Sequence, residues 1–131
     1  MSIAVGERMK TYLGERNDSG VSVKILRDAG RQRPLPLYLT KGIPKTVKFG
    51  WGSASEEASQ LALSLLYDFL GPENRDIALK LHARFRDLML APIRVDVWEL
   101  SENEMRRAVL ELMKESEVRI RIERERDKPK E

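Results

Sequence analysis

The chain has 131 residues, no cysteine and one histidine, and 34% of its residues are charged. This length suits one domain, and the missing cysteines exclude disulfide frameworks, thiolate metal sites and cysteine nucleophiles. The N-terminus lacks a basic stretch followed by a long apolar run, so we expect no signal peptide, no membrane association and a cytoplasmic location.

The charge is unevenly distributed along the chain. The formal net charge is +3, but residues 1–50 carry ten Lys and Arg against four Asp and Glu. Such asymmetry can attract an anionic partner, although a solvated basic surface is the simpler interpretation. The many Glu, Lys and Arg residues, with few Asn and Gln, form a thermophile-like composition.

The N-terminal part is predicted to form β-strands. Residues 9–13 and 21–26 flank the turn-forming sequence Asn17-Asp18-Ser19-Gly20, which predicts a β-hairpin. Residues 34–39 are expected to be extended at a sheet edge or in a connection, because proline cannot donate a ladder hydrogen bond. A further short strand is expected at residues 45–49.

The middle of the chain is predicted to be helical. Residues 56–70 place apolar side chains at helical spacing over a wide face, which indicates a central, buried helix. Ser53 or Ser55 can cap its start, and Gly71-Pro72 would end it. A second helix is predicted at residues 74–90. Its expected apolar side consists of Ile77, Leu81, Phe85 and Leu88.

The C-terminal part begins with a predicted strand at residues 93–98, whose Ile93, Val95 and Val97 alternate with polar residues or Trp98. Ser101 and Glu104 then form a capping box. The buried stripe expected for the following helix is Met105, Ala108, Val109, Leu112 and Met113.

Two interpretations stay open for residues 115–126. Alternation of Val118, Ile120 and Ile122 with charged residues favours a strand, whereas the absence of Gly and Pro would also allow the preceding helix to continue. We favour the strand, which could pair with a second copy to form a homodimer. Beyond Arg124 we expect disorder.

The predicted fold is α+β: an antiparallel sheet with N-terminal hairpin strands, packed on a central Ala/Leu-rich helix and two further helices. We divide the chain into an N-terminal extension (1–8), a single domain (9–114) and a charged C-terminal strand or tail (115–131). The residues assigned to structural turns and the core are Phe49, Gly50, Trp51, Gly52, Leu61, Leu65, Phe69 and Trp98.

Neither a catalytic site nor a cofactor or metal site is predicted. The only histidine, His82, has no serine motif beside it, so an ordinary hydrogen bond on a helix is the simpler interpretation. Four carboxylates lie in or beside the expected core elements and could be buried, although surface salt bridges are the simpler interpretation for each of them. These carboxylates are Asp68, Asp76, Asp87 and Asp96.

Residues 49–55 are rich in glycine and serine and precede the central helix, so their N–H groups could face a phosphate. Glu56 and Glu57 would repel an anion there, and no P-loop sequence follows. We therefore favour a structural role, in which Gly50 and Gly52 allow a tight turn into the helix.

Nucleic-acid binding by the basic N-terminal sheet is an alternative function, although no known nucleic-acid-binding motif accompanies the charges. Tyr12, Tyr38 or Trp51 would supply stacking groups. The basic residues that could contact phosphates or a partner are Arg16, Lys24, Arg27, Arg31, Arg33, Lys41, Lys45 and Lys48.

Several short motifs occur together over residues 10–113. They are Tyr12-x-Gly14-x-Arg16, Pro34-Leu35, Phe49-x-Trp51-Gly52, Ala58-x-Gln60-Leu61-Ala62-Leu63-x-Leu65-Leu66 and Trp98-x-Leu100-Ser101. In this combination the chain resembles a small-protein family of unknown function that is common in bacteriophages, plasmids and related mobile elements.

The resemblance implies provenance and fold, and it carries no catalytic residues. We therefore expect a non-enzymatic accessory protein of a phage or mobile element, which acts by binding a host or element protein. Host transcription, defence and replication machinery are the candidate targets.

Overall fold

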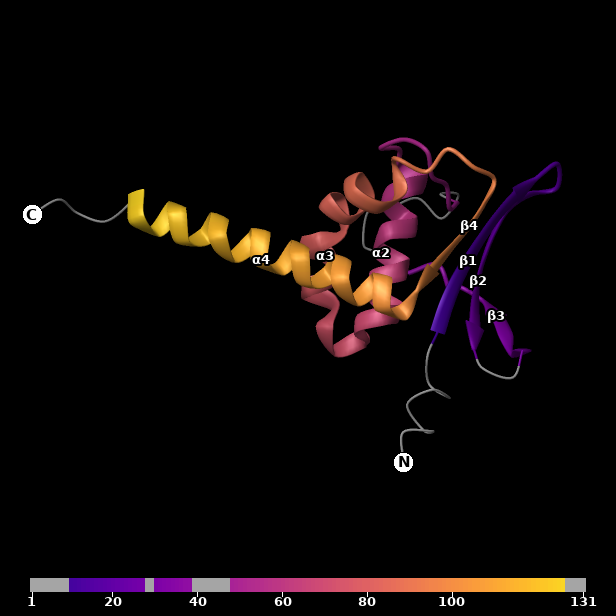
Figure 1. The fold of residues 1–131 in the computed structure, drawn as a ribbon, viewed down its shortest axis with the longest axis horizontal. Helices are drawn as coiled ribbons and strands as arrows, with labels where there is room; N and C mark the ends of the chain where they lie inside the picture. The colour runs from indigo at the N-terminus through magenta and orange to yellow at the C-terminus, as the bar shows by residue number, and fades with distance from the viewer. Residues whose placement is uncertain (1–9, 28–29, 39–47, 127–131) are drawn as a thin grey trace, which may run out of the picture.

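The computed structural model describes residues 10–27, 30–38 and 48–126, with side chains through residue 117. Four antiparallel strands form one sheet in the order β3-β2-β1-β4. They are β1 (Lys10–Asn17), β2 (Gly20–Arg27), β3 (Gln32–Pro34) and β4 (Val97–Ser101). The helices lie on one side of this sheet (Figure 1), so the predicted α+β fold is confirmed.

The predicted N-terminal hairpin is present as β1 and β2. Asp18 and Ser19 form the turn, in which the Ser19 N–H donates to the Asn17 side-chain oxygen at 2.8 Å. Gly20 follows with φ of 124°, a conformation that L side chains rarely adopt. Alternation along the strands places Tyr12, Val23 and Ile25 in the core.

Helix α2 (Glu56–Leu70) is the central helix and has the predicted bounds. Ser55 is its N-cap, because its hydroxyl accepts from the Ala58 N–H at 3.1 Å. Gly71 ends the helix with φ of 92°. Residues from Ala58 through Leu66 are almost all buried, as expected for the hub of a small domain.

The second predicted helix is divided into three parts. A 3-10 turn (Pro72–Asn74) leads into α3 (Arg75–Phe85), and a π-helical turn (Arg86–Leu90) follows. The wider π-turn shifts the helical phase, so Leu90 is fully buried. The expected core position Leu88 is therefore wrong, because that side chain is exposed.

The prediction of a strand at residues 93–98 is largely wrong, because β4 begins at Val97. Val95 and Val97 are 56% and 58% exposed, while Trp98 is buried. Trp98 lies opposite Gly14 of β1, where an added Cβ would overlap the indole ring. Because Gly14 has no side chain, the indole ring of Trp98 can occupy the space beside it. The larger apolar surface of Trp98 is therefore buried, and Val95 and Val97 face the solvent.

The predicted C-terminal strand is also wrong, because α4 (Glu102–Arg126) continues through it. The Ser101–Glu104 capping box starts this helix, with both hydrogen bonds at 3.1 Å. No Gly or Pro interrupts residues 102–126, and Glu, Lys and Arg are good helix formers. The expected domain boundary at residue 114 falls inside α4, and Met113 is exposed instead of buried.

The turn before α2 packs against the core. Trp51 is buried and packs edge-on against Trp98, with 5.4 Å between ring centroids. Gly52 has φ of 91°, and its N–H donates to the Leu90 carbonyl. Leu61 and Leu65 are fully buried, whereas Phe49 and Phe69 are partly buried against the core.

Several predictions fall wholly or partly on residues outside the described ranges. The N-terminal extension 1–8 lies outside them, as do residue 9 of the first expected strand, residue 39 of the expected extended segment, residues 45–47 of the expected strand at 45–49 and residues 127–131 of the end that we expected to be disordered. The rest of the segment 45–49, residues 48–49, is not in a strand.

Candidate anion-binding site

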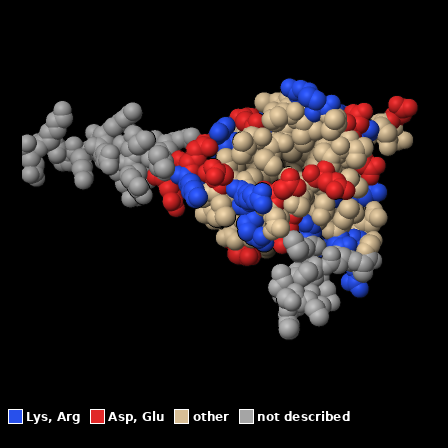
Figure 2. All heavy atoms as spheres, in the orientation of Figure 1, with Lys and Arg blue, Asp and Glu red and all other residues tan. Residues whose placement is uncertain are grey.

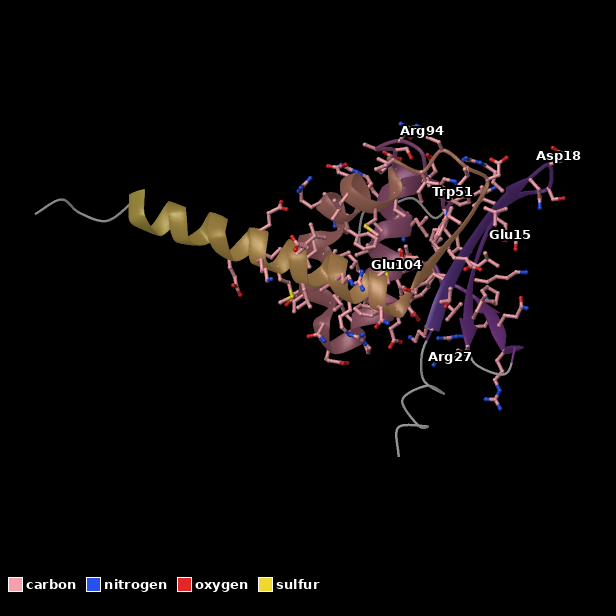
Figure 3. The ribbon with its side chains drawn as sticks, viewed as in Figure 1. Glu15, Asp18, Arg27, Trp51, Arg94 and Glu104 are labelled. Carbon is pink, nitrogen blue, oxygen red and sulfur yellow. The ribbon has the colours of Figure 1, made fainter. Side chains whose placement is uncertain are left out.

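Three arginines meet at one end of the sheet, where they line a pocket of about 140 Å³. Arg27 comes from the end of β2, Arg31 from the following connection and Arg33 from β3. Ile25 and Gln32 complete the lining, and the pocket walls are almost entirely hydrocarbon. The labelled Arg27 marks this end of the sheet in Figure 3, far from Glu15 and Asp18 at the hairpin end.

The local chain path brings these arginines together. The Arg27 N–H donates to the Arg31 carbonyl at 2.7 Å, which closes the connection between β2 and β3. Gly30 supports this tight path with φ of 75°. Arg33 pairs with Ile25 in the ladder and therefore points toward the helix side of the sheet.

Asp68 of α2 lies beside the site, where it contacts one of the three arginines. Its side chain is only 4% exposed and accepts hydrogen bonds from the Tyr12 hydroxyl at 2.7 Å and the Lys10 ammonium at 3.0 Å. The Arg33 guanidinium also contacts it, at 3.4 Å. This buried carboxylate has its charge compensated and holds Arg33 in place.

Burial raises the pKa of the Tyr12 hydroxyl far above its ordinary value, and the Asp68 carboxylate raises it further. Burial and Asp68 also raise the pKa of Tyr38, whose ring stacks on Tyr67 with 4.0 Å between centroids. Both phenols are therefore neutral at physiological pH. Tyr12 acts as a hydrogen-bond donor to Asp68.

Arg27 and Arg31 form no ion pair with any described residue, in contrast to Arg33. Arg27 and Arg31 line the same pocket as Arg33. A guanidinium group is a planar, bidentate donor that suits a carboxylate or phosphate. The arrangement can thus bind a single anionic group whose hydrocarbon part lies against the pocket walls.

A larger pocket of about 340 Å³ adjoins the same end of the sheet and shares Arg27. Its lining mixes both signs of charge. The other residues are Lys10, Thr11, Leu26, Glu99, Ser101 and Glu102.

The remaining predicted basic residues do not join the pocket. Arg16 stacks over Trp51, 4.8 Å from the ring centroid, and pairs with the Asp96 carboxylate at 3.2 Å. Lys24 lies on the opposite face of the sheet, and Lys48 is exposed on the segment before α2. Lys41 and Lys45 lie outside the described residues. On the face shown in Figure 2, basic and acidic side chains are interspersed.

The other chemically suggestive residues are engaged or exposed. His82 Nδ1 lies 2.7 Å from the Leu79 carbonyl, the ordinary helix contact that we expected. Asp76, Asp87 and Asp96 are exposed. Within residues 10–27, 30–38 and 48–117, no three His, Asp or Glu side chains gather as metal ligands.

Sequence reasoning singled out the three arginines and named Asp68 for inspection, but it missed Lys10 as a partner of Asp68. The strand alternation that places Lys10 and Tyr12 on one face was the available clue. In the part of the chain that the structure describes, none of the helices combines the length and apolar character needed to cross a membrane.

Among comparisons with known proteins, only the comparison with protein families gives a match. No curated protein and no solved structure matches it. A family model matches residues 12–111, which include most of β1, all of β2, β4 and the helix α2, and the three arginines. The chain therefore belongs to a family of unknown function (DUF6166).

Proposed function

We propose that this protein is a non-enzymatic accessory protein that binds another protein, and that the pocket of Arg27, Arg31 and Arg33 receives an acidic side chain of that partner. The observation that carries the proposal is that three arginines line one pocket whose walls are almost entirely hydrocarbon. A glutamate side chain has matching parts, because its methylene groups suit the walls and its carboxylate suits the arginines.

The setting that we propose is a phage or another mobile element, with the protein acting in the cytoplasm of a host. The resemblance described above supports this part of the proposal. The charged, thermophile-like composition favours a host that grows at high temperature.

Affinity capture from a lysate of the source organism tests the proposal. We compare the natural chain with Arg31→Glu and with the control Lys80→Glu, which makes the same charge change on the exposed face of α3. The natural chain and the control should retain the same protein. Arg31→Glu should retain about tenfold less, because a like charge would then face the acidic group.

Competition gives a second readout for the same contact. Soluble polyglutamate should displace the retained protein, whereas polylysine should not. Equal retention by all three chains would remove the pocket from the proposal. Retention of no protein would overturn protein binding altogether.

Nucleic-acid binding is the second candidate, because the arginines that line the pocket could also contact phosphate. Arg16 and Lys24 lie away from the pocket, so we expect contacts to only about two or three phosphates and a correspondingly small salt slope. Fluorescence anisotropy with single- and double-stranded oligonucleotides at several salt concentrations measures this slope. An affinity that hardly changes from low to moderate salt would eliminate this candidate.

A further inference from the structure

β4 is an outer strand of the sheet, and β1 is its only neighbouring strand among the described residues (Figure 1). The Arg16 N–H donates to the Asp96 carbonyl at 2.8 Å, which fixes the phase of the ladder between the two strands. Trp98 and Leu100 follow Asp96 at intervals of two residues, so their backbone groups also face β1. The backbone groups of the residues between them point to the open edge.

Val97 and Glu99 carry the unused backbone groups of this edge. Each has an N–H and a C=O that point away from β1, at the spacing that a further strand would require. The edge ends at Ser101, whose N–H donates to the capping glutamate of α4. It also ends at Val95, whose carbonyl accepts from the Trp51 indole at 2.9 Å. Two donors and two acceptors therefore remain for an added strand.

The two outer edges of the sheet differ in their protection against a further strand. β3, at the opposite edge, has three residues and ends in Pro34, which has no N–H. β4 has five residues, no proline and an unbroken register with β1. Val97 is 58% exposed on this edge strand, so an added strand would also cover apolar surface. β4 is therefore the edge that can accept a strand.

The charges on and beside β4 indicate which kind of strand would fit. Residues 95–104 contain four acidic side chains and no Lys or Arg. Three of these carboxylates are engaged with described residues: Asp96, Glu102 and Glu104. Glu99 is exposed and has no ion-pair partner in the part of the chain that the structure describes. A cation directly opposite Glu99 on an added strand would be favourable.

A cationic strand from another protein meets this requirement, whereas the β4 edge of a second copy would bring further carboxylates and no cation. We propose that β4 binds an extended, basic segment of another protein as an antiparallel strand, which continues the pairing of the sheet. A Lys or Arg of this segment lies opposite Glu99, and a β-branched residue two positions later lies opposite Val97. This surface lies across the sheet from β3 and its Arg33, so it is distinct from the anion-binding pocket.

Amide hydrogen exchange of the full chain, measured by NMR, tests the backbone pairing. The probe is the capped peptide Thr-Thr-Lys-Thr-Val-Thr-Thr at millimolar concentration, because it favours an extended chain and has the required Lys and Val. The Val97 and Glu99 amides should exchange rapidly in the free chain and about fivefold more slowly with the peptide. The Trp98 and Leu100 amides should be slow in both, because they already face β1. Val97 and Glu99 amides that are slow from the start, or that the peptide leaves unchanged, would overturn the proposal.

N-methylated forms of the peptide separate strand pairing from general charge attraction. Methylation of the Lys and Val amides removes the donors that face β4 and should abolish binding. Methylation of the Thr amide between them should be tolerated, because that N–H faces away from β4. Equal binding of the two methylated peptides would show that the peptide does not add to the sheet as a strand.

Charge reversal at Glu99 tests the specificity. The natural chain should bind the lysine peptide about tenfold more tightly than the same peptide with Glu in place of Lys, and Glu99→Lys should reverse this preference. The matched control is Arg31→Glu, which also reverses an exposed charge but lies near the other edge. It should keep the natural preference, which separates this outcome from that of the partner-binding pocket. An unchanged preference in Glu99→Lys would contradict the role of Glu99.

A second copy as the occupant is tested by sedimentation without peptide, which should give a mass of 15.1 kDa. Val97→Pro is the variant for this test, because the Val97 N–H faces away from β1 and an edge position of this kind tolerates proline. The same variant should lose the binding of the lysine peptide. A dimer that Val97→Pro returns to a single chain would assign the edge to a second copy and overturn the proposal.

Discussion

At the scale of single residues, Asp68 ties the sheet to the central helix. Its carboxylate accepts from Tyr12 and Lys10 of β1 and contacts Arg33 of β3, although it belongs to α2. Each of these donors is already oriented toward the helix by strand alternation. The carboxylate thus joins three elements that are distant in the sequence.

Asp68→Asn should destabilise the fold by about 2 kcal/mol, because it leaves two cations beside a neutral, buried amide. Urea unfolding measures the change in the free energy of unfolding. Asp76→Asn is the control, since Asp76 is exposed in the first turn of α3. A loss no larger than that of the control would show that the buried network adds no stability.

The raised pKa of Tyr12 makes stability depend on pH in alkaline solution. The unfolded chain loses the phenol proton near pH ~10 while the folded chain keeps it, so stability is complete below ~10 and falls above it. The fall from this group is at most ~1.4 kcal/mol per pH unit.

In Tyr12→Phe this contribution is absent. Urea unfolding at pH ~9 and pH ~11 should therefore show a smaller loss for Tyr12→Phe than for the natural chain. Parallel losses in the two chains would contradict the assignment of the titration to Tyr12.

At the scale of elements, α2 was the most predictable part of the molecule. Its apolar residues keep one helical period for four turns, a serine precedes it and Gly71 follows it. The local helix signals of α2 and the burial of its side chains in the fold predict the same structure, so the tertiary packing did not change what the local sequence favours. The hairpin β1–β2 was predictable for the same reason, because its turn sequence fixes its register.

Capping gives α2 a prediction of its own. Ser55→Ala should lower the free energy of unfolding by about 1 kcal/mol, because the Ala58 N–H loses its acceptor. Ser53→Ala serves as the matched control, since Ser53 is exposed and does not cap the helix. Both values come from denaturant unfolding. Equal losses would mean that the cap contributes nothing beyond ordinary surface substitution.

Elements whose positions depend on distant contacts were not predictable. The alternation of Ile93, Val95 and Val97 indicated the wrong face, because the space left by Gly14 admits Trp98 from a strand more than 80 residues away. The π-helical turn leaves no signature in the apolar spacing. In residues 115–126, alternating valine and isoleucine suggested a strand, but the helix begun by the capping box simply continued.

At the scale of the whole molecule, the fold is complete before α4 ends. A chain that stops at Glu117 keeps every buried side chain described here and the Arg84–Glu115 contact. In dilute solution, its free energy of unfolding should lie within about 0.5 kcal/mol of the full-length value.

Denaturant unfolding of the shortened and full-length chains, both in dilute solution, checks this prediction. A large loss of stability in the dilute, shortened chain would mean that the end of α4 contributes to the core.

The candidate site was only partly foreseeable for a related reason. Charge counting identified the basic N-terminal region, including Arg27, Arg31 and Arg33. It could not show that Arg16 would stack on Trp51 or that Lys24 would point to the other face of the sheet. Grouping of charges depends on strand register and on a turn closed by one backbone hydrogen bond, and neither has a signature in composition.

Two polar side chains on the buried face of α2 have a further consequence. The Ser64 hydroxyl accepts from the Tyr38 N–H at 3.1 Å, and the Gln60 amide donates to the Tyr38 carbonyl at 2.6 Å. The helix α2 thus hydrogen-bonds both the backbone N–H and the backbone carbonyl of Tyr38, as a neighbouring strand would. If the connection shifted by one residue, Leu37 or Leu39 would meet these groups with different geometry. Gln60 and Ser64 therefore fix the position of the segment after β3 relative to α2. Apolar replacements at these two residues would preserve burial but would allow that segment to adopt more than one position.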